Sequence, residues 1–332
     1  MDIDAYAAAH RDEWDELARL GQKRRFSGAE ADELIERYQS GATQLSALRT
    51  TSGSSVQADR LSLLLSRARL RFSGASNNVL SRLPLFFAAQ LPAALYRIRW
   101  LSLAVTLGTA LVALLYGYWA LQTPGVLAGF GTEEFRRQFA EEDFVSYYSE
   151  HPPSSFTGLV WTNNAWLAAQ CVAFGIVGVY APYLLLSNAQ NLGVSAAIMA
   201  DNGRLDIFFL YIAPHGQLEL YAIFVAGAAG LRIFWSWIAP GARTRAAALA
   251  EDGRALITVA VGLTLALLLS GVIEGYVTRQ ESWPWVVKIG IGTVALGLFL
   301  YYQWGVGRRA HRDGETGDLD EFEAGAKQLV AG

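Results

Sequence analysis

His215 and Glu219 are the residues of this sequence whose types and spacing most readily support chemistry. They lie four residues apart where a long apolar run begins, and on a helix this spacing places both side chains on one face. Ionisable groups at the edge of a lipid layer are costly, so such a pair predicts a functional site. An imidazole next to a carboxylate can pass a proton, bind an ion or ligate a metal.

Glu274 is the predicted third member of this cluster. The apolar helix that starts near 218 and the next one, which ends near 277, are joined by a short connection. They therefore run antiparallel, and the start of the first lies beside the end of the second. His215, Glu219 and Glu274 are accordingly weak candidates for ligands of a divalent metal ion.

Two other interpretations of the cluster stay open. The three groups could instead relay protons, or bind an ion or a polar headgroup. They could also be structural. In that case Pro214 and Gly216 form a tight start of the helix, and Glu219 lies in its first turn, favoured by the helix dipole and hydrogen-bonded to His215.

The chain as a whole is too apolar for an ordinary soluble protein. It has 332 residues, of which 52% are hydrophobic, and its apolar residues form long unbroken runs. These features predict an all-α, polytopic helical membrane protein. About a hundred mainly polar residues precede the first apolar run, so we expect no cleavable signal peptide. The single cysteine, Cys171, lies in an apolar run and is interpreted as a packing residue.

Residues 1–78 are predicted to form a cytoplasmic helical region. Its first part has the pattern of two amphipathic helices, and Ser27-Gly-Ala-Glu30 has the spacing of a capping box at the start of the second. A third helix is expected at about Val56–Phe72. The helices could pack as a small bundle, with His10 as one of its packing residues.

Residues 79–100 predict an amphipathic helix that lies on the inner surface of the membrane. Leucine and aromatic side chains occur there together with Arg82, Arg97 and Arg99, which would face anionic headgroups. A nucleic-acid-binding face is the weaker interpretation because apolar side chains dominate the segment. We therefore expect no nucleic acid as a partner.

Residues 101–305 are predicted to form the transmembrane domain. The acidic, aromatic stretch at 122–164 is expected to be an extracytoplasmic loop with a short helix or two, and 306–332 a polar tail. Five apolar runs are long enough to span a hydrocarbon layer of about 30 Å. They lie at about 101–121, 165–187, 217–238, 255–277 and 284–304.

Five crossings would leave arginines such as Arg243 and Arg245 on the outer side, against the positive-inside rule. A sixth crossing at 189–213, in two short pieces broken at Asp201-Asn-Gly-Arg204, removes this conflict. We favour such a broken crossing over a re-entrant or cytoplasmic loop. Both termini are then cytoplasmic and the cluster faces the outer side near Asn164. Without the crossing, the cluster faces the cytoplasm near Asn188.

Four glycines are expected to give the spans small faces at which helix backbones approach each other. Arg232 lies about 20 Å along the helix axis from Glu219, on a different face. It is therefore interpreted as a snorkelling residue or as a counter-ion to another helix. The four packing glycines are Gly227, Gly230, Gly271 and Gly275.

Familiar catalytic motifs are missing from the sequence. It contains no P-loop, no dinucleotide fingerprint, no G-x-S-x-G and no H-E-x-x-H. We therefore expect a protein that is not an enzyme and needs no cofactor.

Several short motifs together resemble the stage II sporulation protein M family, over roughly residues 80–305. The most specific are Pro214-His-Gly-Gln-Leu-Glu219 and Val272-Ile-Glu-Gly-Tyr-Val277. The asparagines Asn164, Asn188 and Asn191 belong to further matching stretches and join the candidate polar cluster. Asn188-Ala-Gln-Asn191 departs from the family's usual Asn-Gly pattern. The amino-terminal region is similar to that of the longer actinobacterial-type members.

The resemblance implies a role as a scaffold or recruiter in the bacterial cell membrane. In endospore formers the namesake works with a peptidoglycan-degrading enzyme and a further membrane-anchored protein. Our hypothesis is therefore a multi-pass scaffold of a cell-envelope complex, whose partners are the lipid bilayer and other envelope or membrane proteins. A homo-oligomer is also compatible with the sequence. The alternative is a channel or transporter with a polar pathway around His215, Glu219 and Glu274.

Overall fold

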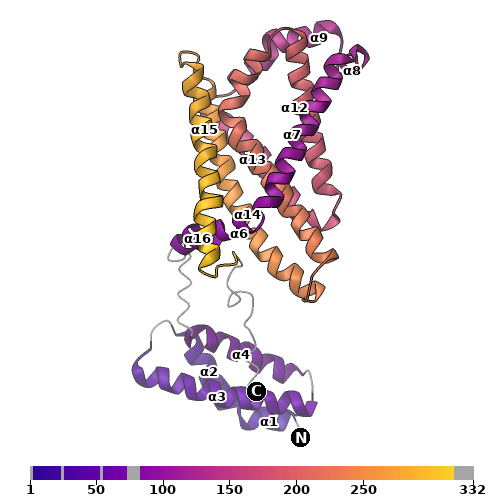
Figure 1. Ribbon diagram of the computed structural model, residues 1–332. Helices are drawn as coiled ribbons and strands as arrows, with labels where there is room; N and C mark the ends of the chain where they lie inside the picture. The colour runs from indigo at the N-terminus through magenta and orange to yellow at the C-terminus, as the bar shows by residue number, and fades with distance from the viewer. Residues whose placement is uncertain (1–2, 24–25, 53–54, 73–82, 318–332) are drawn as a thin grey trace. The chain divides into compact units, whose positions relative to one another are not determined.

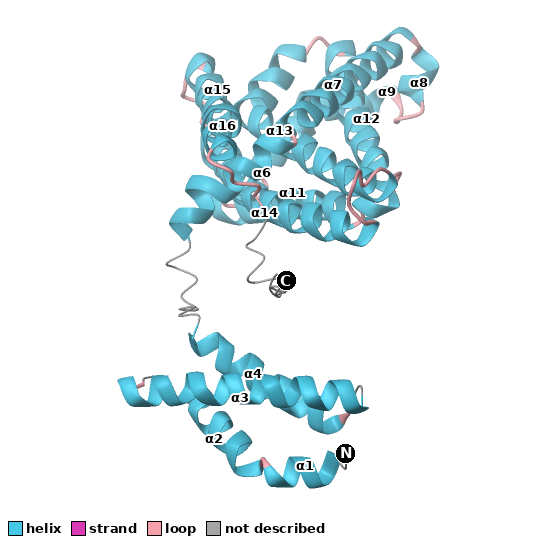
Figure 2. Ribbon diagram, turned by 60° about the horizontal axis from the view of Figure 1, so that its bottom comes forward, coloured by secondary structure: helices cyan, strands magenta, loops and turns pink. Residues whose placement is uncertain are grey.

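The computed structural model describes residues 3–23, 26–52, 55–72 and 83–317, and every regular element in these ranges is a helix (Figures 1 and 2). The predicted all-α class is therefore confirmed. The chain separates into two compact units, Met1–Ser81 and Arg82–Gly332. Each unit is described by itself below.

The first unit is a small helical bundle with its own core. Its capping box forms as predicted, because the Ser27 N–H donates to the Glu30 carboxylate at 3.0 Å and the Glu30 N–H donates to Ser27 Oγ at 3.3 Å. Trp14, Leu17 and Leu61 are among its buried residues. The helices are α1 (Ile3–Ala9), α2 (Arg11–Gln22), α3 (Gly28–Ser52) and α4 (Val56–Phe72).

The second unit consists of long helices that run alternately in opposite directions (Figure 1). Short helices α8 (Pro124–Ala128), α9 (Glu133–Gln138) and α10 (Phe144–Ser146), together with the turns η2 (Phe139–Asp143) and η3 (Tyr147–Ser149), follow the first long helix. The remaining elements are η1 (Phe86–Gln90), α6 (Leu91–Arg97), α7 (Arg99–Gln122), α11 (Pro153–Ala173), η4 (Gly175–Val177), α12 (Tyr180–Asp201), α13 (Leu205–Ile238), α14 (Arg245–Val272), η5 (Ile273–Thr278), α15 (Trp285–Tyr301), η6 (Tyr302–Val306) and α16 (Gly307–Arg312).

Four helices of the described chain are long and apolar enough to cross a membrane. On α7, Trp100 and Trp119 are exposed near the two ends and lie about 29 Å apart along the axis. Tryptophans are enriched at both membrane interfaces, so this spacing fits a spanning helix. The four candidate spans are Arg99–Gln122, Leu205–Ile238, Arg245–Thr278 and Trp285–Arg312.

The prediction of one span at 165–187 is wrong, because the helix ends at Ala173 and a new one begins at Tyr180. Gly178 has φ +75°, a conformation that suits glycine. A Cβ on Gly175 would lie 2.6 Å from the Cα of Gly230, so the turn packs directly on α13. Two antiparallel helices, α11 and α12, thus replace the single expected span.

The expected break at Asp201-Asn-Gly-Arg204 is present, but it separates two long helices and does not interrupt a short crossing. Gly203 has φ +70° in this turn, and α13 then runs without interruption from Leu205 to Ile238. The predicted start at 217 and the broken segment 189–213 are therefore wrong. The expected loop 122–164 likewise ends earlier, because α11 starts at Pro153.

Helices α6 and α16, near the two ends of the described part of the second unit, lie at the same end of the helix bundle. Gln303 Nε2 donates to the Leu95 carbonyl at 3.0 Å, and the rings of Tyr96 and His311 are 5.4 Å apart. This places the start of α7 beside α16 (Figure 1). The chain therefore runs along the length of the helix bundle an even number of times.

The helix directly before α7, α6, is packed into the core, whereas Leu85 and Phe87 ahead of it are exposed. Leu91 and Leu95 are buried in the same cluster as Leu263. A Cβ on Gly262 would lie 2.4 Å from the Leu91 side chain, so α6 fits closely against α14. Residues 91–95 of the predicted interfacial helix 79–100 are thus buried within the unit, residues 79–82 lie outside the described residues, and the place of the helix at the membrane surface stays a prediction.

Candidate functional site

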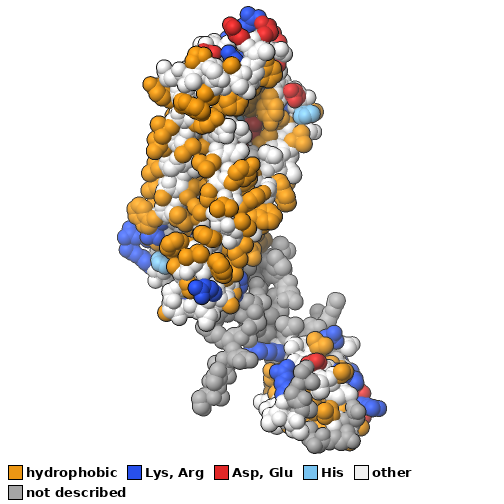
Figure 3. All heavy atoms as spheres, turned by 90° about the vertical axis from the view of Figure 1, so that its right-hand side faces the viewer, with side chains coloured by type: hydrophobic (Ala, Val, Ile, Leu, Met, Phe, Trp, Pro, Cys, Tyr) orange, Lys and Arg blue, Asp and Glu red, His pale blue; other side chains and the backbone are white. Residues whose placement is uncertain are grey.

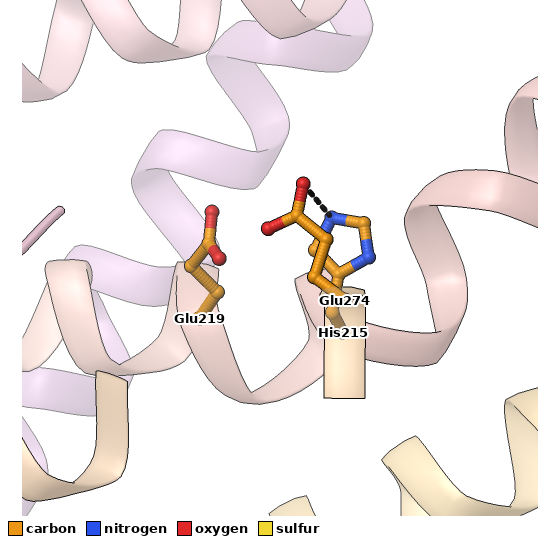
Figure 4. Close-up of side chains that lie close together, drawn as sticks. All are labelled: His215, Glu219 and Glu274. Carbon is orange, nitrogen blue, oxygen red and sulfur yellow. Dashed lines mark ion pairs between the residues drawn. The ribbon is translucent and has the colours of Figure 1, made fainter. Parts of the chain in front are cut away.

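The structure brings His215, Glu219 and Glu274 together (Figure 4). His215 and Glu219 occupy successive turns of α13, and Glu274 lies on the π-helical segment η5 at the end of α14. One potential ligand atom from each lies within 4.8 Å of the others. π-Helical turns are often found at functional sites.

The imidazole of His215 lies beside the Glu274 carboxylate without a normal hydrogen bond. Nε2 is 3.7 Å from Glu274 Oε1, and both side chains are 5% exposed. Its other nitrogen, Nδ1, is 3.2 Å from Thr278 Oγ1. Among the described residues, Glu274 Oε2 has no hydrogen-bond partner. Figure 4 shows this second oxygen turned toward Glu219.

Glu219 completes the cluster from the other side. Its Oε2 accepts a hydrogen bond from Ser270 Oγ at 3.3 Å, and Ser270 Oγ also lies 3.1 Å from the His215 carbonyl. The buried side chain of Asn164, on α11, is close enough to interact with the Glu219 carboxyl group. Three helical segments, α11, α13 and α14 with η5, therefore build the site.

The glycines of η5 and α14 let α11 approach this site closely. A Cβ on Gly275 would lie 2.2 Å from Thr157 Oγ1, and one on Gly271 would lie 3.3 Å from the Thr157 carbonyl. Thr157 Oγ1 in turn donates to the Gly271 carbonyl at 3.1 Å. The predicted face of small residues, Gly271 and Gly275, is therefore present, and it packs against α11.

Gly227 and Gly230 form a second small face on α13. A Cβ on Gly230 would lie 2.2 Å from the Cys171 carbonyl, and one on Gly227 would lie 2.6 Å from the Leu185 side chain. Cys171 is fully buried there, as expected for a packing residue. These contacts hold α11 and α12 against α13.

Pro214 and Gly216 do not start a helix, because both lie well inside α13. Proline has no N–H to donate within the helix, and α15 packs against this turn. A Cβ on Gly292 would lie 2.0 Å from the Pro214 carbonyl oxygen. Gln217 Nε2 donates to the carbonyls of Ala213 at 2.9 Å and Ile289 at 3.3 Å. The proposed structural role of a helix start is therefore wrong.

An aromatic layer from the short helices after α7 covers the cluster. The Tyr148 ring lies 6.1 Å from the His215 ring and 5.0 Å from Tyr211. Burial, reinforced by the negative charges of Glu274 and Glu219, raises the pKa of the Tyr148 phenol well above its usual range. Tyr148 is thus neutral at physiological pH and shields the site from water.

The other predicted site residues lie elsewhere. Asn191 is exposed and Asn188 half-buried on α12, a helix that contributes no residue to the cluster. Arg97 donates to Asp252 at 2.8 Å, and Arg99 lies over the Tyr96 ring at 3.6 Å. Arg82 is outside the described residues. Arg232 also pairs with Asp252, at 3.2 Å, as expected for a counter-ion to another helix.

Sequence reasoning missed the residues that orient the cluster. Ser270 lies four residues before Glu274 and Thr278 four residues after it, so both could have been found from helical spacing. Tyr148 gives no local signal, because it reaches the site from a distant segment. Lys288 was also missed, although it is buried and its Nζ donates to the Thr278 carbonyl at 2.9 Å.

Comparison with known families agrees with these features. The family model of stage II sporulation protein M matches residues 82–279, more than half of the chain. A domain of unknown function, DUF8413, matches residues 4–74. Neither a curated protein nor a solved structure gave a match. The chain belongs to the stage II sporulation protein M family.

Proposed function

We propose that the second unit, called the membrane unit from here on, binds a divalent metal ion through His215, Glu219 and Glu274. We also propose that the protein serves as a scaffold in the cell membrane. The observation that carries the metal site is the unpartnered oxygen of Glu274, which is buried and faces a second carboxylate. Buried carboxylates repel each other and are poorly solvated, and a bound cation offsets both costs.

The distances within the cluster fit a shared metal ion. A separation of 3.7 Å between His215 Nε2 and Glu274 Oε1 is too long for a hydrogen bond. It agrees with two ligand atoms that bind the same ion, each at a distance of about 2.0–2.2 Å from it. Thr278 Oγ1 contacts His215 Nδ1 and Ser270 Oγ donates to the Glu219 carboxylate, and such hydrogen bonds commonly orient the side chains that bind a metal. One imidazole with carboxylates suits zinc or another transition metal.

Metal analysis of the purified protein tests this proposal. The detergent-solubilised full chain is stripped with a chelator, incubated with zinc or manganese and desalted before its metal content is measured. We expect about one ion per chain, and its loss in His215→Ala and Glu274→Gln. The exposed residues His151 and Glu281 lie outside the cluster, so His151→Ala and Glu281→Gln serve as matched controls. A wild-type protein without stoichiometric metal would refute the proposal.

The orientation that we propose places the metal site toward the outer side. Arg97, Arg232, Arg243 and Arg308 belong to the end of the unit that holds the start of α7 and the end of α15. Hydrophobic side chains cover the middle of the unit, with charged ones gathered toward its ends (Figure 3). By the positive-inside rule this basic end faces the cytoplasm. A reporter fused after Gly332 should then be cytoplasmic.

The scaffold role draws support from the separate first unit. This unit has its own core and matches a family model of its own. Val56 and Leu63 are exposed apolar residues seven positions apart, on one face of α4. We propose that the first unit recruits cell-envelope proteins to the membrane unit. Val56→Asp with Leu63→Asp should weaken co-purification with a peptidoglycan-remodelling partner and leave the thermal stability unchanged.

Ion transport is the second candidate function, because ionisable side chains inside a membrane often lie on ion pathways. The residues between Glu219 and Arg232 on α13 are apolar and mostly buried, which favours a bound ion over a conducting path. Flux measurements in liposomes distinguish the two functions. A zinc or manganese flux that Glu219→Gln abolishes would favour transport over the scaffold.

A further inference from the structure

A second charged cluster surrounds Asp252 on α14, far along the helices from the metal site. This carboxylate is 2% exposed. It accepts hydrogen bonds from Arg97 at 2.8 Å, Arg232 at 3.2 Å and Arg243 at 3.4 Å, and from the Ser236 hydroxyl. Three guanidinium groups therefore converge on one buried carboxylate.

Positive charge remains in excess after these pairs are counted. Glu251 is the second acid here, 2.7 Å from Arg243 and 3.7 Å from Arg97. Arg99 adds a fourth guanidinium, which donates to the Tyr96 carbonyl at 2.7 Å and lies over the Tyr96 ring. Among the described residues Arg99 pairs with no carboxylate. Four arginines thus face two acids.

A cavity of about 200 Å³ opens within this cluster. Its lining includes Arg97, Arg99, Arg232, Asp252 and His311. A water molecule takes up about 30 Å³ in the liquid, so the cavity has room for a small polar group. Because most of the polar side chains around it are cationic, the group that it fits is an anion.

The cavity lies at the level where lipid headgroups are expected. Arg99 is followed directly by Trp100, whose exposed ring packs edge-on against Trp304 at 5.0 Å. Tryptophans mark the membrane interface. The guanidinium of Arg99 lies 5.8 Å from each of these two rings, so the cavity wall and the interfacial tryptophans are at one depth.

We propose that this cavity binds a phosphate group, supplied by an anionic phospholipid or by a soluble phosphate. The planar guanidinium presents paired N–H donors that match phosphate oxygens. Arg99 and Arg232 provide these donors, His311 adds a third, and Asp252 holds Arg97 and Arg232 in place. This binding site is independent of the proposed metal site and lies toward the opposite, cytoplasmic end.

Lipid binding by the full chain tests the proposal. The detergent-solubilised protein is titrated with phosphatidylglycerol, with phosphatidylcholine and, separately, with inorganic phosphate, and bound molecules are counted by native mass spectrometry. Arg99→Gln removes the unpaired guanidinium, and Arg99→Lys keeps its charge. Arg308 is exposed at the same end and outside the cavity, so Arg308→Gln is the matched control.

We expect saturable binding of one phosphatidylglycerol, weakened about fivefold by Arg99→Gln, weakened less by Arg99→Lys, which keeps the charge but lacks the paired donors, and little changed by Arg308→Gln. Binding of inorganic phosphate with the same dependence on Arg99 also supports the phosphate site, and it indicates that a soluble compound supplies the phosphate group. Equal losses of ligand binding in Arg99→Gln and Arg308→Gln would show non-specific electrostatic attraction to the basic surface and overturn the proposal. So would the absence of any preference for the anionic ligands over phosphatidylcholine.

Discussion

Gly275→Ala should destabilise the membrane unit, although the same substitution in an open helix is stabilising. The added Cβ would lie 2.2 Å from Thr157 Oγ1 and 2.9 Å from the Pro153 carbonyl, so α11 must move away from η5. Overpacking of this kind costs about 1–3 kcal/mol. Loss of the bond from Thr157 to the Gly271 carbonyl adds about 1 kcal/mol. Since α11 carries Asn164, we also expect weaker metal binding.

Thermal unfolding in detergent, followed by circular dichroism, measures this effect. At about 2–4 °C per kcal/mol, we expect Tm to fall by roughly 4–16 °C. Gly253 lies on the same helix, and a Cβ there meets nothing within 4 Å. Gly253→Ala should therefore raise stability by up to about 1 kcal/mol. Thr157→Ala removes the clashing hydroxyl and should partly rescue Gly275→Ala. If Gly275→Ala is as stable as the wild type, the close approach of α11 and η5 is wrong.

Three further predictions concern the charged groups. Chelation should lower the Tm of the wild type but not that of His215→Ala, because a ligand at 100 times its Kd stabilises a protein by about 2.7 kcal/mol. Asp252→Asn should destabilise the protein by about 1.5–3 kcal/mol, since it removes the buried carboxylate that pairs with the half-buried Arg97, Arg232 and Arg243; unchanged unfolding would contradict the charge cluster. In the first unit, hydrogen bonds from Lys23 and from Ser27 lower the pKa of Glu30 from 4.5 to about 2. The stabilisation by Glu30 is therefore complete above pH 4.5 and is lost as the pH falls toward 2. Glu30→Gln should remove this part of the acid sensitivity, which circular dichroism between pH 5 and pH 2 would detect.

Local signals in the sequence were sufficient for several parts of the structure. The capping box at Ser27 and Glu30 depends on side chains three residues apart, and it forms as predicted. The meeting of Glu274 with His215 followed from helical spacing and from one short antiparallel connection. Both inferences need only geometry that is fixed within one or two helices.

The predicted helix boundaries were wrong where the chain stays apolar through a turn. Phe174, Ile176 and Val177 are as apolar as the helices around them, so hydropathy did not reveal the break before Tyr180, and its glycines, Gly175 and Gly178, were the local signal. The start of α11 was assigned to the acidic, aromatic loop at 122–164, although residues 153–164 contain no acid. Thr157 and Asn164 are buried there against other helices, and such burial is a property of the tertiary packing.

The two charged clusters together fix how α13 and α14 pair. Ser270 meets the His215 carbonyl near one end of the pair, and Asp252 meets Arg232 near the other. The two contact positions are about 26 Å apart along α13 and about 27 Å apart along α14. Because these lengths match, both contacts form in a single register of the antiparallel pair. A slip by one helical turn would leave Asp252 and Glu274 buried without their partners. The small and apolar residues between the clusters allow close packing but do not determine the register. The two charged clusters at the ends of the pair determine it.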